Sequence, residues 1–358
     1  MDKTYNILAI NPGSTSTKIA VYQNETLQFD EVIRHPAEET AKYEAIYDQF
    51  DFRKDVILKV LKDRNVDLSY FDAVVGRGGN MKPVAGGTYR VNEQMIEDLR
   101  VGVMGQHASN LGGVLAHEIA EVYGLPAFIV DPVVVDEFEE FARISGMPDI
   151  QRKSKDHPLN QKSVARQAAA AMGGDYSDFN FLVAHLGGGI SVGVHKRGKI
   201  IDVNNALDGD GPFSPERAGG LPVGSLVDLC FSGKYTKKEI MKKIVGNGGL
   251  MAYLGTNDGR EIQKRIQAGD DYARLIYQAM AYQIAKEIGA GATVLKGQVD
   301  AILLTGGIAY DAICMEWIRE RVSFIAPVKI FPGEFEMIAL TKGVLRVFRQ
   351  EEEEKMYL

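Results

Sequence analysis

The sequence predicts an α/β protein built from two related domains, and two pairs of repeated stretches carry that prediction. Ile7–Phe29 and Phe181–Val203 share one plan: an apolar run, a polar residue, a glycine-containing turn, an alternating strand, a polar hairpin and a third strand. Phe71–Asn80 and Val299–Ala309 are both strands that reach two adjacent glycines. Because both pairs recur in the same order, we interpret the chain as an internal duplication.

The segments between these strands carry apolar residues at helical spacing. A further strand, Ala127–Val130, follows one of them, which is typical of a mixed sheet with helices on its faces. The predicted helices are Gln94–Leu99, Leu111–Tyr123, Ser163–Ala171, Tyr272–Ile288 and Asp311–Val322.

The domain boundary is predicted near Ser145–Lys155, where glycine, proline and a group of charges interrupt the pattern. We therefore expect domains at 1–150 and 151–334. Ile338–Phe348 predicts a last helix, and we expect 335–358 to join the first domain. The acidic run Glu351–Glu354 is predicted to be a solvated end.

Composition limits the partners of the chain. With 358 residues, 45% of them hydrophobic, it can bury a large core. A net charge of −7 without a basic block argues against nucleic acid or an anionic membrane as partner. The cysteines Cys230 and Cys314 predict free thiols, no apolar run approaches the roughly 18–20 residues of a membrane span, and MDKTYNILAI is too short and charged for a signal peptide. We expect a soluble cytoplasmic protein.

Several common motifs do not explain the glycines. The chain has no G-x-x-x-x-G-K-[ST] phosphate loop. Gly187 and Gly189 imitate a dinucleotide motif, but a strand follows them where that motif opens a helix. Ser191 stands in a formal G-x-S-x-G, yet it alternates with valines in a strand, so a serine hydrolase is disfavoured. His117-Glu118 lacks a second histidine, and no zinc-ligand spacing occurs.

Phosphate binding by hairpin turns explains the positions of these glycines better than any of those motifs. A tight turn exposes backbone N–H groups, and glycines let phosphates approach closely. In the first turn Ser14 and Ser16 can add hydroxyl donors, Lys18 a charge, and Asn11 can orient a metal-bound water. With a second cradle at His185–Gly189 and a Gly306-Gly307 turn, the sequence favours a nucleotide bound between two domains.

These motifs resemble a known family. "NPGSTSTK" at Asn11–Lys18 and "HLGGGIS" at His185–Ser191 are similar to those of the short-chain carboxylate kinases, the acetokinase family, within the actin, Hsp70 and sugar-kinase superfamily. The resemblance extends from Asn11 to Glu334. It implies two duplicated actin-like domains with a nucleotide cleft between them. It also implies reversible, ATP- and Mg²⁺-dependent conversion of a short-chain carboxylate to an acyl phosphate. Butyrate is the favoured substrate, and we expect a homo-oligomer.

The resemblance also assigns roles to single residues. Arg77 is expected to bind the substrate carboxylate, Asp131 to be the active-site aspartate, His157 to contact the transferred phosphoryl group, and Arg217 to be the second active-site arginine. Magnesium is expected at Asn11 and Glu334. The nucleotide is expected at Asn11, Ser14, Ser16, Lys18, His185, Gly187, Gly188, Gly189, Asp258, Gly306 and Gly307.

One departure and several alternatives accompany the resemblance. Acetate kinases usually have H-L-G-N-G where this chain has Gly188, so backbone N–H groups must replace a side-chain amide there. Acetate, propionate and isobutyrate stay open as substrates. An actin-like ATPase or chaperone would need no carboxylate-binding arginine, and a sugar kinase would need a base to deprotonate a neutral hydroxyl. A carboxylate is already ionised at neutral pH, so its kinase needs charge neutralisation instead.

Overall fold

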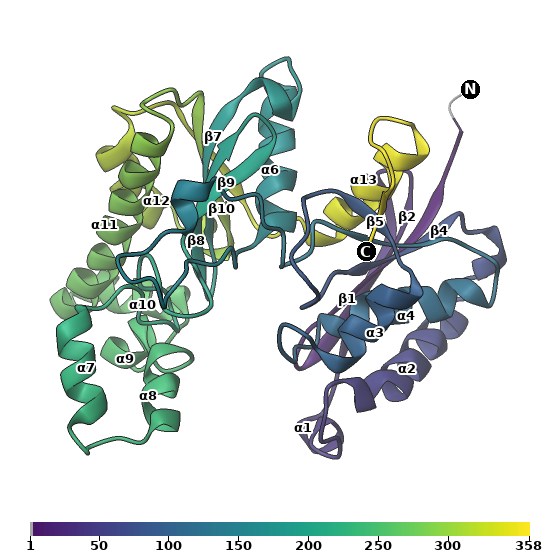
Figure 1. Cartoon of the computed structure of the whole chain (residues 1–358), viewed down its shortest axis with the longest axis horizontal. Coiled ribbons are helices and arrows are strands. Elements are labelled where there is room, and N and C mark those ends of the chain that lie inside the picture. The colour runs from purple at the N-terminus through teal and green to yellow at the C-terminus, as the bar shows by residue number, and fades with distance from the viewer. Residues whose placement is uncertain (1–2) are drawn as a thin grey trace. The chain divides into compact units, whose positions relative to one another are not determined.

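The computed structural model describes residues 3–358, which divide into two compact units (Figure 1). Unit 1 contains the described residues up to Asp136 together with Phe335–Leu358, and unit 2 is Glu137–Glu334. The break therefore lies earlier than the predicted 150. The reason is that Phe138 and Ala142 pack into a small cluster with Ile200 and Val203 of unit 2. The opening residues Met1 and Asp2, used above against a signal peptide, lie outside the described residues.

Unit 1 is built on a seven-stranded sheet. Its first three strands form an antiparallel meander, and two later strands extend it in parallel beside the first. The sheet order is β12-β5-β6-β4-β1-β2-β3. The strands are β1 (Asn6–Pro12), β2 (Ser16–Gln23), β3 (Thr26–Arg34), β4 (Ala73–Arg77), β5 (Thr88–Arg90), β6 (Ala127–Val130) and β12 (Lys355–Met356).

Unit 2 is built on a five-stranded sheet in the order β11-β10-β7-β8-β9. Here too an antiparallel meander is extended by two parallel strands beside its first strand. The strands are β7 (Asn180–Leu186), β8 (Ile190–Lys196), β9 (Lys199–Val203), β10 (Ala301–Gly306) and β11 (Val328–Pro332).

The two sheets share order, direction and one irregularity. The run β6-β4-β1-β2-β3 corresponds to β11-β10-β7-β8-β9. The pairing of β2 with β3 shifts between Val21 and Tyr22, and that of β8 with β9 shifts between Val194 and His195. Tyr22 pairs with the second residue of β1, and His195 pairs with the second residue of β7. An irregularity at the same place in both meanders confirms the predicted duplication.

Helices cover both faces of each sheet, as Figure 1 shows. In unit 1, α2, α3 and α4 lie on one face and α13 on the other; in unit 2, α11 and α12 lie opposite α6. Helix α4 can approach β4 closely because Gly76 has no side chain. A Cβ on Gly76 would overlap the Gly112 carbonyl. The helices are α1 (Ala37–Thr40), α2 (Phe50–Asp63), α3 (Glu93–Val101), α4 (Asn110–Glu121), α5 (Glu140–Arg143), α6 (Pro158–Ala171), α7 (Val223–Phe231), α8 (Lys237–Ile244), α9 (Gly249–Leu254), α10 (Gly259–Gln267), α11 (Asp271–Val294), α12 (Ala312–Val322) and α13 (Glu336–Phe348), with 3₁₀ turns η1 (Tyr47–Gln49), η2 (Leu68–Tyr70), η3 (Tyr176–Asp178) and η4 (Gly307–Tyr310).

The predicted helices all occur, whereas α2 and the run α7 to α10 were not predicted. The acidic end is not simply solvated, because Glu354 pairs with Arg90 at 2.6 Å and Glu352 accepts a hydrogen bond from the Thr88 N–H at 2.8 Å. Within residues 3–358, none of the helices is both long and apolar enough to span a bilayer.

Candidate active site

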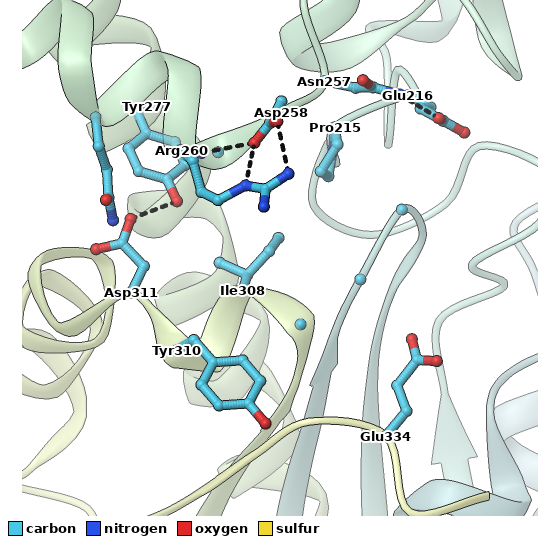
Figure 2. Close-up of a pocket in the computed structure, with 15 residues that line it drawn as sticks. Pro215, Glu216, Asn257, Asp258, Arg260, Tyr277, Ile308, Tyr310, Asp311 and Glu334 are labelled. Carbon is cyan, nitrogen blue, oxygen red and sulfur yellow. Dashed lines mark hydrogen bonds and ion pairs between the residues drawn. The ribbon is translucent and has the colours of Figure 1, made fainter. Parts of the chain in front are cut away.

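A cavity of about 520 Å³ opens in unit 2, where the turn between β7 and β8 meets the starts of α10 and η4 (Figure 2). Five of the predicted nucleotide or metal residues line it, and they come from four separate parts of the unit 2 sequence. They are Gly187, Gly188, Asp258, Gly307 and Glu334. The cavity therefore brings together the two glycine turns that the sequence analysis had connected by their phosphate-binding pattern, and adds Asp258 and Glu334, which it had connected by resemblance.

Three glycines make up the turn between β7 and β8, since Leu186 and Ile190 are already paired. A Cβ on Gly189 would overlap Nη1 of Arg217 and lie 2.7 Å from its Cζ. The turn is tied down by the Ser214 hydroxyl, which donates to the Gly188 carbonyl at 2.6 Å. Only glycine at 189 lets the Arg217 guanidinium lie against this turn.

Arg217 itself is half-buried and held from two sides. Its backbone N–H donates to the Ser214 hydroxyl at 3.1 Å, and its guanidinium donates to the carbonyl of Ala206. Burial lowers the pKa of Arg217, while the negative charges of Glu216 and Asp208 oppose that shift. A guanidinium held this firmly is a preorganised positive group beside a phosphate-sized turn.

The adjacent turn at Gly306 requires glycine for two reasons. Its φ is +93°, which lies in the left-handed region that favours glycine, and a Cβ there would overlap the carbonyl oxygen of Leu186. Gly307 has open space on its side-chain face and lines the cavity. This arrangement leaves room for a ligand next to β10.

Two predicted histidines stack at the edge of this region. The rings of His157 and His185 lie 4.0 Å apart between centroids, at an angle of 12°. Each ring is fixed by a side chain, because His157 Nδ1 is 2.8 Å from the Ser191 hydroxyl and His185 Nδ1 is 2.8 Å from Asn160 Nδ2. His185 Nε2 lies 4.0 Å from Glu334, so the stack connects the cavity wall to α6.

Asp258 begins α10 and is tied to the next turn. Its Oδ1 accepts from the Arg260 N–H at 2.9 Å, and both carboxylate oxygens pair with the Arg260 guanidinium. These hydrogen bonds hold the pKa of Asp258 below its usual value. Figure 2 shows Arg260 and Ile308 in the cavity, with the Tyr277 hydroxyl donating to Asp311 at 2.7 Å. The sequence analysis did not find these four wall residues because their types carry no motif of their own.

In unit 1, three predicted residues stand at the carboxyl ends of the parallel strands β1, β4 and β6. Arg77 Nη1 is 2.9 Å from Glu336 and 3.4 Å from the Asn11 amide oxygen, and Asn11 Nδ2 donates to Glu336 at 2.6 Å. Glu336 opens α13 and was not predicted. Glu336 belongs to no motif, and only the packing of α13 places it beside Arg77.

Asp131 directly follows β6 and is 2% exposed. Its Oδ1 accepts from the Gly87 N–H at 2.7 Å, and its own N–H donates to the Gly87 carbonyl at 2.9 Å. The φ of Asp131 is +37°, a strained value for a residue with a side chain. The two bonds to Gly87 hold that conformation.

His107 is a second residue of this region that sequence analysis missed. Burial and the positive charge of Arg77 lower the pKa of His107, which favours its neutral form. Its Nδ1 lies 2.8 Å from the Ser109 hydroxyl.

The turn between β1 and β2 contains Ser14, and Ser16 is the first residue of β2. Lys18, which was predicted to add a charge here, lies two residues further along β2. Lys18 pairs with Asp30 of β3 at 2.7 Å. A second cation lies at this turn. Arg53, on α2, is 0% exposed, and its guanidinium donates to the carbonyls of Gly13, Ser14 and Ser16. These carbonyls are therefore turned inward towards a buried positive charge.

Comparison with known proteins identifies the family of the chain. The acetokinase family model matches residues 150–328. A protein named butyrate kinase 2 from Clostridium acetobutylicum is 59% identical over 353 residues, which is 99% of either chain. A probable butyrate kinase from Clostridium botulinum (strain Alaska E43) is 56% identical over 354 residues, covering 99% of this chain and 100% of the relative.

The fold is also similar to that of a solved acetate kinase. The crystal structure of the acetate kinase of Porphyromonas gingivalis matches with a TM-score of 0.78 at 20% identity, covering 95% of this chain and 99% of that one. This likeness shows the fold, which is of the actin, Hsp70 and sugar-kinase type. On sequence identity over its whole length, the chain belongs to the acetokinase family and, within it, to the butyrate kinases.

Proposed function

We propose that the chain transfers the γ-phosphoryl group of ATP to the carboxylate of a short-chain fatty acid, with butyrate favoured, and that the reaction is reversible. A carboxylate oxygen forms a bond to the γ-phosphorus as the bond to the β-phosphate oxygen breaks, giving an acyl phosphate and ADP. The supporting observation is the unit 2 cavity, which is lined by Gly187 and Gly188 of the three-glycine turn. The Arg217 guanidinium lies against Gly189 of that turn, and the rings of His157 and His185 stack nearby.

The unit 2 residues suit the phosphoryl group. Transfer between two anions needs positive charge and N–H donors directed at the transferred oxygens, and little covalent chemistry from the protein. Arg217 supplies a fixed guanidinium, and His157 a ring fixed by Ser191. Gly187, Gly188 and Gly189 place no side chain in the way, and Gly188 and Gly189 supply backbone N–H groups, since the Gly187 N–H already donates to the Gly189 carbonyl at 3.1 Å. Asp258 and Gly307 line the cavity, and Gly306 is proposed to complete the nucleotide site beside them.

The unit 1 residues suit the carboxylate. Arg77 presents a planar guanidinium at the carboxyl end of β4, and such a group pairs bidentately with carboxylates. The substrate is ionised at neutral pH, so no general base is required. Asp131 accepts a backbone hydrogen bond from Gly87, which fits an orienting role better than proton abstraction. These features favour a carboxylate kinase over a sugar kinase.

Magnesium is proposed to be held by Asn11 and Glu334, together with the nucleotide phosphates. Among the described residues there is no cluster of three or more histidine, cysteine or acidic side chains suited to a metal. The few oxygen donors present fit Mg²⁺, which usually takes one or two carboxylates plus substrate phosphates. When bound, it neutralises phosphate charge.

Asn11→Ala and Glu334→Ala test this assignment. Each should raise the magnesium concentration that gives half-maximal activity, while the KM for butyrate changes much less. The measurement is a magnesium titration at fixed nucleotide. An unchanged titration in both variants would exclude these residues as metal ligands.

Cellular location and assembly are also inferences. We infer a cytoplasmic enzyme, since ATP is its substrate and Cys230 is an exposed free thiol. We infer a homo-oligomer of at least two copies, which light scattering of the purified chain tests directly.

ATP turnover that depends on an added acid tests the activity. We expect acyl phosphate, trapped with hydroxylamine, to form in proportion to ADP. A panel from acetate to valerate, with isobutyrate, should give the highest kcat/KM for butyrate. ATP hydrolysis that ignores every acid would instead favour an actin-like ATPase.

A further inference from the structure

A line of hydrogen-bonded side chains runs through the interior of unit 2 to His157. Tyr176 in η3 contacts His195 on β8 at 2.6 Å, and His195 contacts Gln161 on α6 at 2.9 Å. Gln161 Nε2 then donates to the Ser191 hydroxyl at 2.8 Å, and Ser191 contacts His157 Nδ1 at 2.8 Å. In the function proposed above, only His157 and its partner Ser191 have a role; Tyr176, His195 and Gln161 have none.

Helix and strand geometry brings the line together. His157 and Gln161 are one helical turn apart, while Ser191 and His195 lie on the same face of β8. The residue between them on that face is Gly193, where a Cβ would overlap Oε1 of Gln161 and lie 3.0 Å from His195 Nε2. The glycine leaves the space that the Gln161 amide occupies.

The inner half of the line has a defined direction. Gln161 Oε1 can only accept, so His195 Nε2 must carry the hydrogen of that contact. His195 is 0% exposed, and burial together with the charges of Lys162 and Arg166 lowers its pKa well below the usual value. The ring is therefore neutral, its Nδ1 accepts, and the Tyr176 hydroxyl donates to it.

The outer half continues in the same direction. Ser191 is 0% exposed, and its hydroxyl accepts from Gln161. Its single hydrogen must also be satisfied, because a buried hydroxyl without an acceptor is costly. His157 Nδ1 is the acceptor within reach, so the hydroxyl donates to it. Each group thus donates towards the site, and such chains strengthen each member by polarisation.

We propose that Tyr176, His195, Gln161 and Ser191 are positioning residues that hold neutral His157 with its hydrogen on Nε2. That nitrogen then donates to an oxygen of the transferred phosphoryl group, whereas an unprotonated Nε2 would direct a lone pair at the anion. The inference rests on the proposed function only for its effect on turnover; the tautomer itself is a property of the free protein.

Nitrogen NMR of the full-length protein labelled with ¹⁵N-histidine measures the tautomer directly. The chain has six histidines, so single substitutions can assign every ring. At pH 8, above the usual histidine pKa of about 6.5, we expect His157 to be protonated on Nε2 alone. A hydrogen on Nδ1, or on both nitrogens, would overturn the inference without any activity measurement.

Two substitutions test the direction of these hydrogen bonds: Gln161→Glu should reverse it at His157, and His195→Gln should preserve it. In Gln161→Glu the carboxylate accepts from both His195 and Ser191, so His157 should move its hydrogen to Nδ1. In His195→Gln the amide can accept from Tyr176 and donate to Gln161, so His157 should keep its hydrogen on Nε2. Gln167→Glu, on the same helix but outside the line, is the matched control for the added charge.

For Gln161→Glu we expect kcat to fall about 10–100-fold, with KM for butyrate and ATP changed less than about threefold. His195→Gln and Gln167→Glu should stay within about threefold of the wild-type kcat. A flipped tautomer with an unchanged kcat would overturn the positioning role. If the wild type shows no butyrate-dependent turnover, the proposed function fails, while the NMR result still tests the line by itself.

Discussion

The turn between β1 and β2 and the turn between β7 and β8 occupy equivalent places in the two sheets, yet they are held in different ways. In unit 1, buried Arg53 lies behind the turn and donates hydrogen bonds to the carbonyls of the turn. In unit 2, Arg217 lies against the turn itself, in space that a side chain at Gly189 would fill. Both turns thus have an arginine, but from different elements and on different sides.

The difference shows what a duplication preserves. Strand order, strand direction and the position of the irregularity are common to both meanders because they decide whether the sheet pairs and packs. The side chains around the turn are not needed for that, so they could diverge. Unit 1 has hydroxyls over a buried arginine, and unit 2 has glycines beside a half-buried arginine.

The largest difference between the two units should appear when one arginine is removed from the site of each. Arg217→Ala should lower kcat by roughly 10³–10⁵-fold, as arginines that stabilise phosphoryl transfer do. Arg77→Ala should mainly raise the KM for butyrate, because its contact exists before transfer begins. Lysine at either position should restore only part of the activity. Steady-state kinetics with butyrate varied at saturating MgATP separates the two, and a near-normal kcat for Arg217→Ala would contradict its role.

The glycines of the two turns form a matched pair. Gly189→Ala forces the Arg217 guanidinium to move, so we expect kcat to fall about 10²–10³-fold. Gly13→Ala meets only Ser16, 3.4 Å from its carbonyl oxygen and 3.8 Å from its hydroxyl, which are ordinary contacts, so kcat should change a few-fold at most. The same kinetic assay, on variants with wild-type circular dichroism, compares them. Equal losses would mean that Arg217 does not explain the glycine at 189.

Arg53 should matter for stability. Arg53→Met leaves the inward carbonyls of the first turn without their donor, and we expect the free energy of unfolding to fall by about 2–4 kcal/mol. Arg64→Met removes an exposed pair with Glu31 and should cost less than about 1 kcal/mol. Urea unfolding measures both, and similar midpoints would show that the buried guanidinium does not hold the turn.

The smallest effect should be a pH dependence from His35, which contacts Thr17 at 2.8 Å beneath the same turn. Burial, and then the charge of Arg53, lowers the pKa of His35 to about 4. Because the unfolded histidine binds its proton near pH 6.5, His35 destabilises the fold as pH falls from 6.5 towards 4. At pH 5 the loss is roughly 2 kcal/mol.

His35→Gln should remove that part of the pH dependence. The measurement is the difference in unfolding free energy between pH 7.5 and pH 5 for both proteins, in which the titration of other groups cancels. A variant with the same slope as the wild type would contradict a low pKa for His35.

Local pattern was a good guide where the physics is local. Most of the strands, the turns and six helices were predicted because each repeats a two- or 3.6-residue period between glycines. The strands β5, β11 and β12 were not predicted. The run α7 to α10 was missed: α7 buries none of its residues and so lacks an amphipathic pattern, and α8, α9 and α10 are short. The predicted boundary at 150 lies after the break between the two units at Asp136, because Phe138 packs against Ile200 and Val203 of unit 2.

By itself, the sequence determined the α/β class, the duplication, the glycine-containing turns and the family, because these depend on residue order and spacing. Tertiary structure alone decided which charges serve the turns: it paired Lys18 with Asp30, buried Arg53 behind the first turn, and brought Glu336 to Arg77 from the far end of the chain. Charge pairing and hydrogen-bond direction depend on distances of a few ångströms between residues remote in sequence, and no local pattern encodes those distances.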